Sequence, residues 1–188
     1  MITNSIKQIR SGFYSKVIAL IALFSITLVS CNDDDVEEMM ATESIVALAQ
    51  GNADLTFLVS ALTKYPDLVS TLSGDGSYTV FAPTNAAFAS LLTAIGQTSI
   101  NDIPESVLKS VLQYHVVANA TVLSTQLTNG DVATASGENV NVNISSGVKL
   151  NATANVVAAD VKATNGVVHV IDAVLVPPSI APVVGTIV

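Results

Sequence analysis

The spacing of apolar residues changes after Tyr114, and this change sets the fold class. Before Tyr114, apolar side chains recur three and four residues apart, as over 55–62, which is the period of an amphipathic helix. After it, Val, Thr, Asn and Ala dominate and the spacing falls to two, as over 140–144, which indicates strands with one buried face. Helices followed by strands predict an α+β domain instead of a β-α-β repeat.

Start and stop signals predict the helices of the first half. Ser, Thr, Asp and Asn side chains cap helix N-termini, and Pro is favourable at the first helical position. Pro66 is expected to break or restart the second helix. The predicted starts are Thr42, Asp54, Thr84 or Asn85, and Pro104, and the predicted ends include Gly51 and Gly96.

Turn residues predict how the strands are connected. A short strand over Tyr78–Phe81 precedes the helix that begins near Thr84. Asn165-Gly166 indicates a tight hairpin whose turn has positive φ angles. The closing strand is expected to run over Val167–Val176 and to end at a Pro pair. Asp172, near its end, is expected to accept backbone N–H groups.

The first 30 residues have the layout of a bacterial lipoprotein signal peptide. Three basic residues precede an apolar run over 17–29, and Leu28-Val29-Ser30-Cys31, with the only cysteine, resembles a lipobox. We expect cleavage before Cys31 and a diacylglycerol on its sulfur. The alternatives are an uncleaved anchor, for which about 14 apolar residues are short of the roughly 20 needed, and a chance buried thiol.

Removal of this leader makes the chain strongly acidic. Four Lys then face all 15 acidic residues, a net charge of −11. Such a surface repels phosphate backbones, so we expect no nucleic-acid partner. A single cysteine also forbids an internal disulfide, and the fold must be held by packing alone.

Residues 31–41 are predicted to be a solvated tether. Asp33, Asp34 and Asp35 begin a run of acids that repel one another. This run resembles the stretch that directs some Gram-negative lipoproteins to the outer face of the outer membrane; the alternatives are its periplasmic face and a linker that only confers solubility. The acids lack the spacing and the glycine of a calcium-binding EF-hand loop.

Three segments together resemble fasciclin-like domains. They are Thr79-Val80-Phe81-Ala82-Pro83-Thr84-Asn85-Ala86-Ala87-Phe88, then Tyr114-His115-Val116-Val117, then the run from Asn165-Gly166 to Pro177. The resemblance covers residues 42–178, in the expected order, and leaves 179–188 as a tail. It implies a compact β-sandwich or wedge with several helices packed along it.

The family resemblance also implies adhesion to an extracellular protein or polysaccharide. In animal members the Tyr-His segment has been linked to integrin recognition, and Tyr114 and His115 match it. Integrins are animal receptors, so that partner does not transfer to a bacterial lipoprotein. The two residues are therefore either a docking site or a core element joining a helix to a strand.

The residues give little support to catalysis. No Gly-x-Ser-x-Gly nucleophile elbow or P-loop occurs, and the two histidines lack neighbours at metal-ligand spacing. His169 and Asp172 are three apart on a predicted strand and so face opposite sides. We expect no enzyme activity, no cofactor and no metal. Two carboxylates from distant segments could still meet in the folded chain, as they do in glycosidases. The alternatives to adhesion are an envelope protein binding a small apolar or sugar-like ligand, and a protein that acts in envelope assembly.

Asn119, Asn143 and Asn151 each begin a formal glycosylation sequon. In an Asn- and Thr-rich β-region we interpret these residues as turn and edge chemistry.

Overall fold

The computed structural model describes residues 41–184, with side chains to residue 182. Helices dominate the first half and strands the second, which confirms the predicted α+β class. The helices are α2 (Ile45–Gly51), α3 (Thr56–Leu62), α4 (Pro66–Ser73), α5 (Asn85–Ala94), α6 (Glu105–Tyr114) and α7 (Ala181–Val184), with short 3-10 turns η1 (Ala53–Leu55), η2 (Ile100–Asp102) and η3 (Ser124–Gln126). The strands are β1 (Tyr78–Pro83), β2 (Val116–Ala118), β3 (Gly130–Ala133), β4 (Asn139–Asn143), β5 (Lys149–Leu150), β6 (Ala154–Ala163) and β7 (Gly166–Ile171).

Local caps explain where two of the helices begin. The Thr84 hydroxyl accepts a hydrogen bond from Ala87 N at 3.2 Å and caps α5, as predicted. The prediction for α2 was two residues early, because Ser44 and not Thr42 is the residue whose side chain accepts from Ala47 N. Both caps satisfy an N–H group that has no partner inside the helix.

The predicted cap of the second helix was wrong. Asn52 caps η1 by accepting from Asp54 N, and α3 begins only at Thr56. No side chain of its own N-cap residue caps α3. Its Phe57 N donates instead to Asn85 Oδ1 at 3.0 Å, so the cap comes from the first turn of α5. Pro104 is likewise the residue before α6 and not its first residue.

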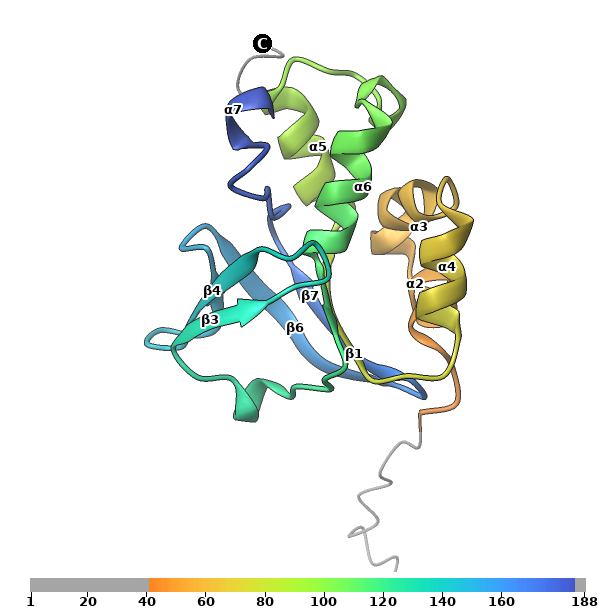
Figure 1. Ribbon diagram of the computed structural model, residues 1–188, viewed down its shortest axis with the longest axis vertical. Helices are drawn as coiled ribbons and strands as arrows, with labels where there is room; N and C mark the ends of the chain where they lie inside the picture. Colours follow the sequence, from red (N-terminus) through yellow and green to blue (C-terminus); the bar gives the residue numbers. More distant parts are fainter. Residues whose placement is uncertain (1–40, 185–188) are drawn as a thin grey trace, which may run out of the picture. The chain divides into compact units, whose positions relative to one another are not determined.

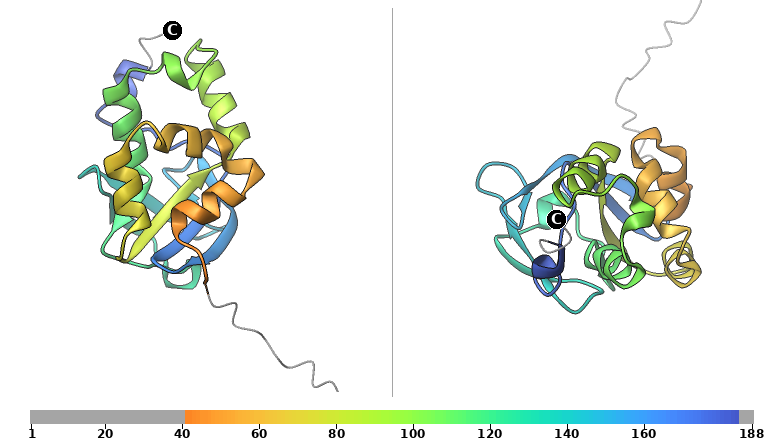
Figure 2. Two further views of the ribbon diagram at one scale, coloured as in Figure 1. Left: turned by 90° about the vertical axis from the view of Figure 1, so that its right-hand side faces the viewer. Right: turned by 90° about the horizontal axis from the view of Figure 1, so that it is seen from above.

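Seven strands form one mixed sheet in the order β2-β1-β7-β6-β5-β4-β3 (Figure 1). The pair β1–β7 is parallel, and the other neighbours are antiparallel. Helices α2, α3 and α4 lie on one side of β1 and β7, and β3 and β4 lie on the other. The left view of Figure 2 looks through these helices onto the strands behind them.

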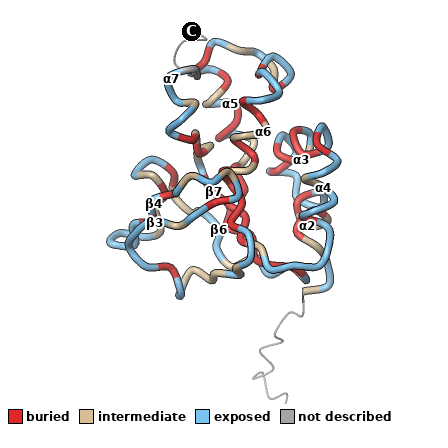
Figure 3. Tube along the Cα trace, viewed as in Figure 1, coloured by how far each residue is buried: buried red, intermediate tan, exposed pale blue. Residues whose placement is uncertain are grey.

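Successive side chains of β1 and β7 point alternately into two separate hydrophobic cores. Val80 and Val168 point toward the helices, in what we call the helix-side core. Phe81 and Ile171, both 0% exposed, point the opposite way into the sheet-side core. Because both faces are covered, the two strands are buried along their length (Figure 3). Burial of each such side chain contributes about 1.5–3 kcal/mol to folding.

Two register shifts bend β6 away from its partner β7. They fall between Val156 and Ala158 and between Ala158 and Val161. Such bulges bend a strand and increase its twist. The far end of β6 therefore carries β5, β4 and β3 over the sheet-side core, where Val142 and Leu150 pack.

The predicted hairpin joins β6 to β7, with Ala163 paired to Gly166. The turn residues are thus Thr164 and Asn165, and only Gly166, with φ +154°, has a positive φ. The predicted positive φ at Asn165 was wrong. The side chain of this buried residue instead forms hydrogen bonds with three backbone groups.

The closing strand is shorter than predicted and ends at Ile171 instead of Val176. Asp172 follows the last strand residue, and its backbone N still donates to the Asn155 carbonyl oxygen at 3.1 Å. As expected, its carboxylate accepts a backbone N–H, that of Asn155, at 2.7 Å. The second carboxylate oxygen accepts from the Asn155 side chain at 2.8 Å. Residues 172–180 then form an irregular segment that leads to α7, and we call this segment the C-terminal strap.

Within residues 41–184 no single helix has the length and apolar character needed to cross a membrane. A bent pair, Ile45–Gly51 with Ala53–Leu62, passes that test by length and composition only, at an angle of 104°.

Candidate functional site

Cys31 and the acidic residues Asp33, Asp34 and Asp35 lie outside the described residues. Lipidation of Cys31 and an export role for the acids remain predictions from the sequence.

Tyr114 closes α6 with a side chain that is 0% exposed. Its hydroxyl donates to the Asn139 carbonyl oxygen at 2.7 Å and accepts from Asn151 Nδ2 at 2.9 Å. Burial raises the pKa of Tyr114, although the hydrogen bond from Asn151 opposes this effect. The phenol therefore stays neutral and ties α6 to β4 and to the β5–β6 turn.

His115 follows Tyr114 and is 2% exposed. Its Nε2 accepts a hydrogen bond from Leu175 N at 2.9 Å, so the ring proton must lie on Nδ1, which faces the Val111 carbonyl oxygen at 2.7 Å. Both ring nitrogens are thus used by backbone groups. The imidazole ties the end of α6 to the C-terminal strap.

The structure favours the core interpretation for both residues. A docking side chain must offer surface to a partner, and Tyr114 and His115 offer almost none. Their neighbours Val116 and Val117 are buried too. The Tyr-His segment is a connector between the two cores and the strap.

This geometry makes the stability of the protein dependent on His115 protonation. Burial lowers the pKa of His115 from 6.5 to about 4, against a weaker opposing effect of the Val111 carbonyl. The unfolded state therefore takes up the proton first, and stability falls as the pH drops from 6.5 to about 4. We expect a loss of about 3 kcal/mol over this range.

Urea unfolding across this pH range tests the expectation, with His115→Gln as the comparison. The variant should be less stable at neutral pH but should lack this part of the pH dependence. Asp67, Asp160 and Asp172 have lowered pKa values, so their contributions are lost at lower pH than that of His115. Parallel pH profiles for both proteins would contradict the assignment.

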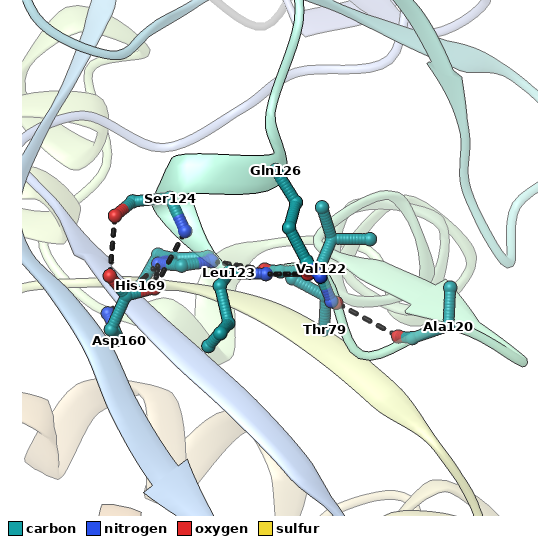
Figure 4. Close-up of polar contacts among 8 residues, drawn as sticks. All are labelled: Thr79, Ala120, Val122, Leu123, Ser124, Gln126, Asp160 and His169. Atoms are coloured by element: carbon teal, nitrogen blue, oxygen red, sulfur yellow. Dashed lines mark hydrogen bonds and ion pairs between the residues drawn. The ribbon is translucent and has the colours of Figure 1, made fainter.

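Ser124, Asp160 and His169 form a second polar cluster (Figure 4). Asp160 lies in a bulge of β6 with φ +60°, an unusual conformation for a residue with a side chain. Its carboxylate accepts from both Ser124 N, at 2.6 Å, and the Ser124 hydroxyl. Its backbone N donates to His169 Nδ1 at 3.2 Å, which leaves His169 Nε2 to donate to the Val122 carbonyl oxygen at 2.9 Å.

This cluster does not have the order of a hydrolase triad, although it contains the three residue types. A nucleophilic serine needs its hydroxyl against the imidazole base. Here the Ser124 hydroxyl is bound to the carboxylate, and His169 is 0% exposed with both nitrogens bound. Partial burial alone would raise the pKa of Asp160, but the hydrogen bonds from Ser124 outweigh it and hold that pKa below its usual value. The cluster fastens residues 122–124 to the sheet.

Thr79, on β1, also attaches the segment before Ser124 to the sheet (Figure 4). Its buried hydroxyl donates to the Ala120 carbonyl oxygen and accepts from Val122 N, each at 2.9 Å. No pattern in the sequence indicates these contacts, because they join residues that are 41 and 43 positions apart.

The described residues contain no group of three His, Cys, Asp or Glu side chains placed to hold a metal ion.

Two open grooves remain as candidate binding surfaces. The α2–β6 groove, of about 350 Å³, is mainly apolar and lies between the helices and the sheet, with Leu48, Leu55, Val161 and Val170 among its lining residues. The asparagine groove, of about 620 Å³, has a polar wall of Asn139, Asn141, Asn151 and Thr153. Its opposite wall is the C-terminal strap with Val174, Val176 and Pro178.

The sequon asparagines perform the turn chemistry that their context predicted. Asn119 and Asn151 have φ angles of +62° and +48°, the left-handed conformation that asparagine tolerates. Asn143 Oδ1 accepts from Ser145 N at 2.9 Å in a local turn.

Comparison with known proteins gives one consistent family. The protein-family model with the description "Fasciclin domain" matches residues 53–177. Protein sll1483 of Synechocystis is 43% identical over 142 residues, which cover 73% of this chain and 77% of that protein.

Mycobacterial proteins are similar as well. The immunogenic protein MPB70 of Mycobacterium bovis is 38% identical over 150 residues, covering 74% of this chain and 72% of its own. The cell surface glycolipoprotein MPB83 of the same species is 38% identical over 144 residues, and the match spans 63% of its length.

The fold matches a solved structure, that of a FAS1 domain pair from the insect cell adhesion molecule Fasciclin I. The TM-score is 0.62 at 16% identity, and the match covers 74% of this chain and 52% of the insect chain. At this identity the comparison shows a shared fold.

Proposed function

The chain belongs to the fasciclin domain family, and from this we propose that it is a lipid-anchored adhesion module of the cell envelope. It would bind an extracellular protein or polysaccharide without catalysing a reaction. The observation that carries the proposal is the family match over 53–177, and the resemblance of the segment that ends at Cys31 to a lipobox supports the anchor.

The names of its relatives support the cell surface as the place of action. MPB83 is described as a cell surface glycolipoprotein, and Fasciclin I as a cell adhesion molecule. We propose that this chain is held at the outer membrane by acyl groups on Cys31, with the acidic tether leading to the outer face.

The polar clusters support a non-catalytic role. Ser124, Asp160 and His169 use their polar atoms on one another and on the backbone, so no nucleophile is held against a base there. Binding then has to use exposed surface, and the largest exposed apolar side chains of the described residues are Phe57, Ile144, Val157 and Val161.

The α2–β6 groove favours a second candidate, an envelope protein that binds a small apolar ligand. The groove lies between helices and sheet, and its lining carries few polar groups, with Glu43 as its single carboxylate. Ligand sites are usually concave and largely enclosed, and this groove is open to solvent. Adhesion therefore remains the preferred proposal.

Cells that produce the protein should aggregate or attach to a surface, and a deletion strain should lose that behaviour. A soluble Cys31→Ser form without the leader should compete with the anchored protein because it occupies the same partner. Cell aggregation and attachment counts measure both effects. Equal attachment by the deletion strain would reject adhesion, and failure of the soluble form to compete would reject a partner outside the membrane.

Replacement of Asp33, Asp34 and Asp35 by Ala should reduce the accessibility of the protein to protease on whole cells. The acids are proposed to act as the export address, so acylation of Cys31 should persist while the protein stays on the periplasmic face. Mass spectrometry of the N-terminus checks acylation. Unchanged accessibility would leave the acids as a spacer only.

A further inference from the structure

The asparagine groove holds polar groups that the fold does not use. The side chains of Asn139 and Thr153 are exposed and have no hydrogen-bond partner within the described part of the chain. The hydrogen bond from Tyr114 to Asn139 uses the backbone carbonyl of Asn139 and not its side-chain amide. An amide and a hydroxyl together offer both donors and acceptors to a ligand.

The neighbouring amides in the same wall are held in fixed positions. Asn141 Nδ2 donates to Asp131 Oδ1 at 2.8 Å, which leaves Asn141 Oδ1 as a free acceptor. Asn151 Oδ1 accepts from Asn141 N at 2.9 Å, while its Nδ2 donates to the Tyr114 hydroxyl. A wall whose side chains are ordered before binding loses less entropy when a ligand arrives.

The opposite wall is aliphatic and equally fixed. The C-terminal strap is attached at Asp172 to Asn155, at Leu175 to His115, and at Ser179 to Glu138, whose carboxylate accepts from the Ser179 N and hydroxyl at 3.1 and 2.6 Å. Between these attachments, Val174, Val176 and Pro178 present C–H surface to the groove. Figure 1 shows β4 and the segment that leads to α7, which supply the two walls.

The charges around the asparagine groove limit the class of ligand that it can bind. None of the residues found to line the groove is charged, and the carboxylates of Glu138 and Asp131 act on Tyr114 in its lining. An anionic polymer would be repelled by these carboxylates, and no cation is among the residues found to line the groove. An uncharged ligand with hydroxyl groups on its edges and C–H groups on its faces matches both walls.

An extended peptide fits the groove less well than a sugar. Peptides that add to a sheet need a strand with free backbone groups. At the polar wall, Asn141 N donates to Asn151 Oδ1 and the Asn141 carbonyl accepts from Asn151 N at 2.8 Å. Strand β4 also lies between β3 and β5 and is therefore no edge strand.

We infer that the asparagine groove binds a neutral segment of an extracellular polysaccharide. This inference rests on the proposed adhesion function and names the class of its partner. Asn139, Asn141 and Thr153 hydrogen-bond sugar hydroxyls, and the strap packs against the sugar ring. The one aromatic residue among the lining residues, Tyr114, is buried, so each site binds weakly and many copies on a cell act together.

Titration of the purified chain in mild detergent, followed by ¹⁵N NMR of side-chain and backbone amides, tests the inference. The probes are hexasaccharides of α-glucan, β-glucan, mannan and chitin, with a hyaluronan hexasaccharide and an extended Val- and Thr-rich peptide as comparisons. A neutral hexasaccharide should shift the Asn139 and Asn141 side-chain amides and the backbone amides of residues 174–176. Asn139→Ala combined with Thr153→Val should weaken binding by about tenfold or more.

Asn101→Ala is the matched control, because Asn101 is exposed on η2 and its side chain has no hydrogen bond in the described region. It should bind as the unchanged protein does. Shifts confined to the α2–β6 groove, stronger binding of hyaluronan or of the peptide, or no saturable shift with any neutral probe would overturn the inference. If the groove variant still supports cell attachment that the deletion strain lacks, adhesion stands and the groove assignment fails.

Discussion

The Gly166→Ala variant is expected to lose at least about 4 kcal/mol of the free energy of unfolding, much of what a domain of this kind possesses. A Cβ atom on residue 166 would lie 2.0 Å from the carbonyl oxygen of Tyr78 and 2.9 Å from its N. Tyr78 and Gly166 are paired in the parallel ladder between β1 and β7. Relief of the clash requires these two central strands to separate at the end where both begin.

Gly137→Ala is the matched control for this prediction. Gly137 also has a positive φ, +86°, but nothing lies within 4 Å of a Cβ atom built there. It should therefore lose only about 1 kcal/mol, the cost of the backbone conformation alone. Urea unfolding followed by circular dichroism measures both variants, and similar losses would show that strand spacing is not the reason for glycine at 166.

The Asn165→Ala variant is expected to lose about 3 kcal/mol or more, because it leaves three backbone groups without partners. Asn165 Oδ1 accepts from Ile45 N, the first residue of α2, at 3.0 Å. Its Nδ2 donates to the carbonyl oxygens of Leu72 and Gly74 at 2.7 and 3.0 Å. A single buried amide thus joins the hairpin to the start of α2 and the end of α4.

Hydrogen exchange and urea unfolding test this role. Asn165→Asp keeps the acceptor for Ile45 N but sets a carboxylate against two carbonyl oxygens, so it should be no more stable than the Ala variant. Asn101→Ala, at an exposed asparagine, should change the free energy of unfolding by less than about 0.5 kcal/mol. Exchange in the variants should rise first at α2 and α4, and a uniform rise would contradict a local link.

Structural features that depend on a few neighbouring residues were predicted well. The period of the apolar residues gave the helices of the first half and the strands of the second. Thr84 capped α5 as expected, and the Asn-Gly pair gave the hairpin between β6 and β7. In each case the signal and the structure depend on the same short segment.

Errors in the element ends arose where a distant residue supplied the hydrogen bond. Asn85 caps α3 from the start of α5, and this removed the need for a cap at Asp54. The closing strand ends at Ile171 instead of Val176, and Leu175, within the predicted strand, donates its backbone N–H to His115 Nε2 instead of to a neighbouring strand. Propensity cannot indicate a partner that lies 60 residues away, as Leu175 does from His115.

The residues of the candidate site were likewise predicted only in part. The sequence drew attention to Tyr114 and His115, and the structure places both in the interior, where they hold α6 to β4 and to the strap. The asparagine groove, with Asn139 and Thr153 on one wall and Val174 on the other, was not predicted. Its two walls come from separate segments of the chain, and the strap that forms one of them is held by hydrogen bonds to Asn155, His115 and Glu138.

By itself, the sequence determined the α+β class, the family, the hairpin and the strongly acidic character of residues 31–188. The tertiary structure decided which side chains remain free to bind a partner. A hydrogen bond that satisfies a buried group forms only where packing brings both atoms together. For this reason three asparagines with the same local propensity have different roles: Asn165 is a buried link, Asn85 caps a distant helix, and Asn139 is an exposed amide.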